Sequence, residues 1–179
     1  MQKLANLIDR ELTWSQPSMR KKEFELHAGE LLAATLRFRS SFGSLAIAES
    51  GDGCWTFKRN GFFKTHVSVR RCDDDTRDIA TFHNNTWSGG GSMEISGGPT
   101  LRASTNLWRT KYSFNSPSEE PLVVFNTHGL VRYSADVEIR PQAAQMLELP
   151  LMVMLGWYLA VMMKNDDAAS ASAAAAAAG

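Results

Sequence analysis

Short segments in which apolar and polar side chains alternate fill most of the chain. They lie at residues 24–26, 31–38, 45–47, 54–57, 62–69, 79–82, 93–95, 100–103, 111–114, 122–125 and 131–139. Alternation with a period of two places successive side chains on opposite faces of a strand. Turn-forming residues separate the segments, and a spacing of about 8–12 residues is typical of an all-β sandwich or barrel. The pattern predicts about eleven or twelve strands. The first segment is ambiguous, because Leu4, Leu7 and Ile8 have helical spacing whereas residues 11–14 alternate like a strand.

Two of the turn regions carry specific expectations. The pair Asn60-Gly61 stands between strand-like segments and is the strongest hairpin signal in the chain. Both central positions of a two-residue hairpin turn of this type need positive φ, which asparagine and glycine tolerate. Trp87 is followed closely by three glycines, so we expect it in an exposed loop, where it can contact lipid or a partner or pack over the barrel end.

One long apolar segment follows the strands. At about 100° per residue, the large side chains of residues 151–163 point in every direction and leave no polar face. Pro150 suits the first turn of a helix, where its missing N–H does no harm. We therefore expect a helix over residues 147–164 that is surrounded on all sides, with Trp157 inside. Gly156 and Ala160 form a narrow strip that a neighbouring wall can approach closely.

The strands and the helix explain each other. A closed barrel of about eight strands is filled by its own side chains, whereas a wider barrel can hold a helix. The predicted fold is mainly β, a closed barrel of about twelve antiparallel strands around a C-terminal central hydrophobic helix. We expect a single domain over residues 1–164, followed by an alanine-rich, low-complexity tail at 165–179. Alanine favours helix but buries little, so this tail is expected to be frayed and exposed.

A membrane span is the alternative use of the apolar segment. A helix over residues 149–163 would be roughly 22 Å long, against a hydrocarbon core of about 30 Å. Extending it toward residue 146 would bring Glu148 into the bilayer. A C-terminal tail anchor stays open as an alternative, although the barrel would then lose the filling of its interior.

Charge and cysteine content narrow the partners and the compartment. Lysine plus arginine number 19, as do aspartate plus glutamate, so no overall field favours nucleic acid, and we expect none as a partner. Cys54 and Cys72 fit neither a disulfide framework nor a four-ligand zinc site. We interpret them as thiols in a reducing compartment, with Cys54 as a small core residue. The N-terminus also lacks a secretory signal pattern, and we expect a cytoplasmic protein, with or without peripheral attachment to a membrane.

Basic residues cluster on both sides of the Asn60-Gly61 turn. If neighbouring strands bring them together, they can bind the phosphates of a lipid headgroup, arginine as a planar fork and lysine as a compact charge. The candidate ligand-binding residues are Lys58, Arg59, Lys64, Arg70 and Arg71. The competing interpretation is that they occupy outward positions that keep the strands soluble and discourage edge pairing.

No motif of the chain indicates catalysis or metal binding. The run Asp73-Asp74-Asp75 lacks the glycine and glutamate of a calcium-binding loop and is expected to be a solvated turn. The histidines are His27, His66, His83 and His128, without the spacing of metal ligands. The cysteines are weak candidates for a nucleophile. We expect no catalytic residue, no metal and no cofactor, with a small enzyme carrying a pocket at one barrel end as the alternative.

Three stretches of the chain carry a family resemblance. They are Cys54-Trp55-Thr56-Phe57-Lys58-Arg59-Asn60-Gly61-Phe62, the stretch from Gly97-Gly98-Pro99 to Leu107-Trp108, and residues 149–163. In this order of strands and helix, residues 11–163 resemble the tubby C-terminal-like fold of tubby proteins, phospholipid scramblases and plant LURP-one-related proteins. The resemblance implies a barrel of about twelve strands around a central helix. A basic surface of tubby proteins binds phosphoinositide headgroups, so it also implies a non-enzymatic binding or scaffold domain for anionic phospholipid or a protein partner.

Overall fold

The computed structural model describes residues 1–41, 43–61, 65–85, 90–129 and 132–178. Within these ranges a short 3-10 turn, η1 (Leu4–Asn6), precedes twelve strands and one α-helix. The strands are β1 (Leu12–Ser15), β2 (Glu23–Ala28), β3 (Leu31–Phe38), β4 (Ala46–Ser50), β5 (Gly53–Asn60), β6 (His66–Arg71), β7 (Ala80–Asn85), β8 (Gly90–Ile95), β9 (Thr100–Thr105), β10 (Lys111–Asn115), β11 (Pro121–His128) and β12 (Ser134–Ile139). The helix is α1 (Leu149–Ala178).

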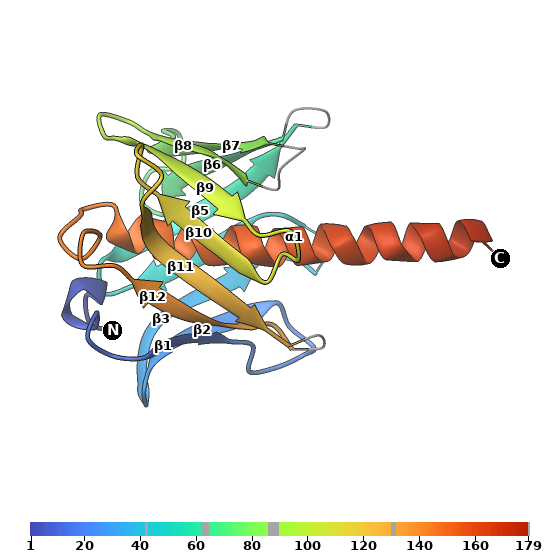
Figure 1. Cartoon of the computed structure of the whole chain (residues 1–179), viewed down its shortest axis with the longest axis horizontal. Helices are drawn as coiled ribbons and strands as arrows, with labels where there is room; N and C mark the ends of the chain where they lie inside the picture. The colour runs from blue at the N-terminus through green and yellow to red at the C-terminus, as the bar shows by residue number, and fades with distance from the viewer. Residues whose placement is uncertain (42, 62–64, 86–89, 130–131, 179) are drawn as a thin grey trace.

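The twelve strands form one closed antiparallel barrel (Figure 1). Each strand pairs with the next in the sequence, and β1 pairs with β12 to close the ring, with Leu12 opposite Val137 and Trp14 opposite Ala135. The ambiguous first segment thus contains both a short 3-10 turn, η1, and a strand, β1, in which Leu12 and Trp14 are buried while Thr13 between them is half-buried. The predicted fold class, a closed barrel with a C-terminal helix, is confirmed.

Helix α1 runs through the barrel, and its C-terminal part continues beyond the barrel as the same uninterrupted helix (Figure 1). Residues 151–162 are all buried. Trp157 stacks on Trp14 of β1 with ring centroids 5.8 Å apart, and Phe24 of β2 packs edge-on against it at 5.6 Å. Each large apolar side chain stabilises the fold by about 1.5–3 kcal/mol when it is buried. The helix is therefore the main filling of the barrel, and Trp157 lies inside as predicted.

The narrow side of the helix faces one wall of the barrel. A methyl group at Gly156 would overlap the ring of Phe125 on β11 and would lie 3.4 Å from Cε2 of Phe114 on β10. The backbone of α1 approaches β10, β11 and β4. The close approach that we expected at the small-residue strip thus occurs at Gly156.

The two ends of the barrel differ. At the end where α1 begins, Leu4 and Leu7 are buried, and the backbone N–H of Leu4 donates to Asp52 Oδ2 at 2.9 Å. The N-terminus lies at this end (Figure 1). We call the opposite end, where α1 leaves the barrel near Met163, the exit end. The first residues of the chain therefore cover one end and leave the exit end free.

Helix α1 does not stop at the exit end. It begins at Leu149, with Pro150 in its first turn as predicted, and stays helical to Ala178. Residues 166–177 are exposed, as expected for the alanine-rich tail, but they are helical rather than frayed, in keeping with the helix propensity of alanine. We call residues 165–178 the extension. No helix within the described ranges is long and apolar enough to cross a membrane.

The interpretation of the cysteines as separate thiols is wrong. Cys54 and Cys72 form a disulfide with Cα atoms 5.4 Å apart. Cys54 lies on the outer face of β5, because Trp55 and Phe57 of the same strand point into the core. The register pairs Trp55 with Arg71, which places the cysteines opposite each other. The argument from free thiols to a reducing, cytoplasmic compartment therefore no longer holds.

The hairpin predicted at Asn60-Gly61 exists, but its turn is longer. Strand β5 ends at Asn60, which pairs with His66 at the start of β6, so residues 61–65 connect the strands. Gly61 has a φ of 85°, whereas Asn60 keeps a negative φ. Residues 62–64, which we assigned to a strand, and Trp87 lie outside the described residues.

Candidate functional site

The strand register separates the five predicted basic residues. Because successive residues of a strand point to opposite faces, Lys58 and Arg59 on β5 lie on different surfaces, and so do Arg70 and Arg71 on β6. Lys64 lies outside the described residues. The single cluster that we expected from these residues is therefore divided among an outer wall and the two ends of the barrel.

Lys58 and Arg70 meet on the outer wall of β4, β5 and β6. Together with Arg39, which follows β3, they line a depression of about 380 Å³ that we call the outer-wall site. Its other lining residues are Leu45, Ile47, Thr56, Asn60, Ser68 and Asp75. This part of the predicted cluster is thus one surface, with an additional arginine.

The three cations of the outer-wall site differ in how they are held. Arg70 Nε donates to Asp78 Oδ1 at 2.6 Å, and the same guanidinium hydrogen-bonds the Asp75 carbonyl oxygen. The hydrogen bond to Asp78, with the charge of that carboxylate, raises the pKa of Arg70. The side chains of Arg39 and Lys58 form no ion pair or hydrogen bond with another described residue. The site thus offers two unpaired cations beside one that is fixed in place.

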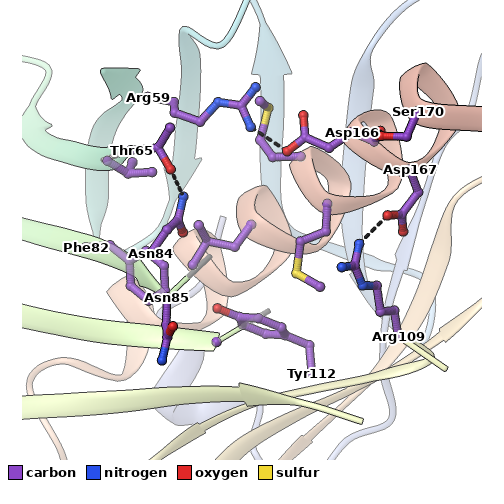
Figure 2. Close-up of a pocket in the computed structure, with 15 residues that line it drawn as sticks. Arg59, Thr65, Phe82, Asn84, Asn85, Arg109, Tyr112, Asp166, Asp167 and Ser170 are labelled. Carbon is purple, nitrogen blue, oxygen red and sulfur yellow. Dashed lines mark hydrogen bonds and ion pairs between the residues drawn. The ribbon is translucent and has the colours of Figure 1, made fainter. Parts of the chain in front are cut away.

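A second pocket, of about 350 Å³, opens at the exit end between α1 and the barrel wall (Figure 2). We call it the exit pocket. Its apolar lining comes from Val67, Phe82, Tyr112, Leu159, Met162 and Met163. Its polar lining comes from Arg59, Thr65, Asn84, Asn85, Arg109, Asp166, Asp167 and Ser170, and Gly90 completes it. The pocket is therefore amphipathic.

Two ion pairs link the helix to the barrel at the mouth of the exit pocket. Arg59 Nη1 on β5 donates to Asp166 Oδ2 at 2.6 Å. Arg109, in the turn between β9 and β10, pairs with Asp167. Figure 2 shows the neighbouring aspartates of the extension reaching these two arginines, one on β5 and the other in the turn between β9 and β10. All four side chains are partly exposed, from 28% for Arg59 to 53% for Asp166.

Tyr112 is a buried residue whose hydroxyl lies in the exit pocket. The residue is 3% exposed, and Figure 2 shows its hydroxyl directed away from Arg109, toward the side where Asn84 and Asn85 lie. Within the part of the chain that the structure describes, no side chain or backbone group hydrogen-bonds this hydroxyl. Burial raises the pKa of Tyr112 far above 10.0, so the hydroxyl keeps its proton and acts as a donor at neutral pH.

The remaining candidates do not assemble a catalytic or metal centre. Three histidines contact carboxylates: His27 with Glu25 at 3.0 Å, His83 with Glu94 at 3.7 Å and His128 with Asp136 at 2.7 Å. Asp74 accepts hydrogen bonds from Thr76, which lower its pKa. The described residues contain no metal-binding group of histidine, cysteine and carboxylate side chains. Among them no histidine hydrogen-bonds a serine or a cysteine, the geometry of an activated nucleophile.

Sequence reasoning missed Arg39 and Arg109 as members of these sites. Arg39 joins the outer-wall site because its N–H bonds to Leu45 and extends the β3–β4 ladder. Arg109 pairs with Asp167, 58 residues away, and no local pattern indicates such a pair. The inward direction of Arg59 could have been predicted from the sequence. It lies two residues after Phe57 and four after Trp55, so its side chain is on the same face of β5 as these two core residues.

The architecture agrees with the barrel and central helix that the tubby-like resemblance implies. Membership of that superfamily stays a prediction. Comparisons of the chain with models of protein families, with curated proteins and with solved structures found no match.

Proposed function

We propose that the protein is a non-enzymatic binding domain that binds the phosphates of anionic phospholipid headgroups at the outer-wall site. The observation that supports this function is the convergence of Arg39 and Lys58, without partners among the described residues, on one depression beside Arg70. Arginine binds phosphate oxygens as a planar fork and lysine as a compact charge. Because Asp78 fixes Arg70, that side chain is positioned before a ligand arrives.

The shape of the outer-wall site suits a headgroup. Hydroxyl and amide groups of Thr56, Asn60 and Ser68 lie beside the cations in the depression, where they can hydrogen-bond the hydroxyls of an inositol ring. The chain has no net charge, so attraction to a membrane is local and falls off within a Debye length, about 10 Å at 0.1 M salt. Binding should therefore weaken sharply as salt increases.

The domain is peripheral to the membrane in this proposal. A tail anchor would need the apolar part of α1 in the bilayer, but residues 151–162 are the filling of the barrel. The outer-wall site contacts headgroups from the side of the barrel, with no need for the helix to leave its place.

Flotation of the protein with liposomes tests this function. We expect the wild type to float at low salt with vesicles that contain phosphatidylinositol bisphosphate, and to stay at the bottom with phosphatidylcholine alone. The double variant Arg39→Glu/Lys58→Glu should lose flotation. The double variant Arg102→Glu/Lys111→Glu makes the same charge change on the outer face of β9 and β10 and should keep it. Wild-type protein that fails to float at low salt, or equal flotation of both variants, contradicts the proposal.

A further inference from the structure

We propose that the exit pocket is a second binding site, for a single-chain amphiphile with an acid group, of the fatty-acid class. This site is separate from the outer-wall site: it lies between α1 and the inner wall, whereas Lys58 and Arg70 point outward. It also differs in chemistry, because an apolar chamber lies below the charged mouth.

The chamber fits one acyl chain. Phe82, Leu159, Met162 and Met163 supply apolar surface, and methionine side chains adapt readily to the shape of an apolar ligand. A volume of about 350 Å³ is at the lower end of the range of about 300–1,000 Å³ for small-molecule pockets. The pocket therefore favours one chain of medium length over a two-chain phospholipid.

The mouth of the pocket already binds acid groups, which are those of the protein itself. Arg59 and Arg109 hold the carboxylates of Asp166 and Asp167. Partly exposed ion pairs contribute little to stability, so an incoming carboxylate can replace either aspartate without a large loss. The extension thus acts as an internal competitor for the ligand's acid group.

Tyr112 gives an independent reason to expect a ligand. The residue is 3% exposed, and its hydroxyl is directed into the pocket without a hydrogen-bond partner among the described residues. A phenolic hydroxyl in this position can donate a hydrogen bond to an acceptor that a ligand brings into the pocket. A ligand oxygen inside the chamber would accept this bond.

Isothermal titration calorimetry of the full chain with decanoate, below the concentration at which decanoate forms micelles, tests the site. We expect one site per chain in the wild type. The variant Arg59→Gln/Arg109→Gln should bind more than about tenfold more weakly, since a single charge-assisted hydrogen bond contributes at least that much. The variant Asp166→Asn/Asp167→Asn should bind more tightly, because the competing carboxylates are gone. Tyr112→Phe should weaken binding.

Two controls keep the result specific. Decanol has the same chain without the acid group and should bind more weakly than decanoate. The variant Arg39→Gln/Lys58→Gln should keep decanoate binding even where it loses flotation, so failure of one site is distinguishable from failure of the other. Several weak sites per chain, equal binding of decanol, or unchanged affinity in both the arginine and the aspartate variants would overturn the proposal.

Discussion

The ring of Phe125 occupies the space into which any side chain at Gly156 would extend. Both residues are fully buried, and Phe125 also packs on Tyr112 with ring centroids 6.3 Å apart. The ring cannot move away without disturbing its neighbours, because protein interiors are close-packed. This contact fixes the rotation of α1 about its own axis.

Gly156→Ala should therefore destabilise the protein. Overpacking of a core costs about 1–3 kcal/mol, which exceeds the gain of about 1 kcal/mol in helix propensity when the clash is fully felt. The midpoint of urea unfolding should fall. Adding Phe125→Leu to Gly156→Ala should recover part of the loss, and Ser172→Ala on the exposed extension should change the midpoint little. If Gly156→Ala is more stable than the wild type, the ring of Phe125 moves to accommodate the added methyl group and the prediction is wrong.

Leu155→Asp should abolish folding. Leu155 is fully buried within the barrel, and an unpaired carboxylate there would lose its hydration without a partner, at a cost comparable to the whole stability of a domain. The matched control is Leu147→Asp, at a position that is 93% exposed. Circular dichroism of the purified variants is the measurement. If Leu155→Asp folds and only leaves a membrane fraction, the helix is an anchor rather than a core.

Removing the disulfide should weaken the fold without destroying it. Cys54 and Cys72 are 18 residues apart, and closing a loop of about 15 residues stabilises by about 3 kcal/mol through the entropy of the unfolded chain. The variant Cys54→Ala/Cys72→Ala should unfold at lower urea concentration than the oxidised wild type. It should match the wild type treated with a reducing agent. If the reducing agent leaves the urea unfolding of the wild type unchanged, this result contradicts the presence of the disulfide.

Two buried tyrosines should make stability fall at alkaline pH. Burial raises the pKa of Tyr112 and of Tyr158, whose hydroxyl donates to the Ser44 carbonyl oxygen at 2.7 Å. Above the ordinary tyrosine pKa of about 10, the unfolded chain releases these protons while the folded chain keeps them. Each tyrosine then removes up to about 1.4 kcal/mol of stability per pH unit.

Urea unfolding at about pH 9 and about pH 11 measures this dependence, with lysine titration common to all variants. Tyr112→Phe should lose less stability between the two pH values than the wild type does. Tyr133→Phe is the comparison at a half-buried position. Equal pH dependence of wild type and Tyr112→Phe would mean that water reaches the Tyr112 hydroxyl.

The local pattern of apolar and polar residues was enough to predict the strands and the helix of this fold, but it was not enough to predict the sites. Strand β3 occupies the predicted residues 31–38, although residues 33–36 are all buried and its burial pattern does not alternate. The buried helix could be predicted because residues 151–163 have no polar face. The disulfide, the outer-wall site and the pair of Arg109 with Asp167 all depend on which strands lie side by side and in which register. A period of two assigns each side chain to a face and by itself separates Lys58 from Arg59, but it does not say which strands are neighbours.

The helix that fills the barrel is also the element made last among those described. Strands β1 to β12 leave the ribosome before α1, and each can pair with its neighbour through a short connection, which favours rapid local assembly. Closure between β1 and β12 encloses residues 149–163, so it has to wait until they have been synthesised. Until then the growing sheet exposes an apolar face, and nascent chains of this protein should depend on chaperones until residues 149–163 have been synthesised.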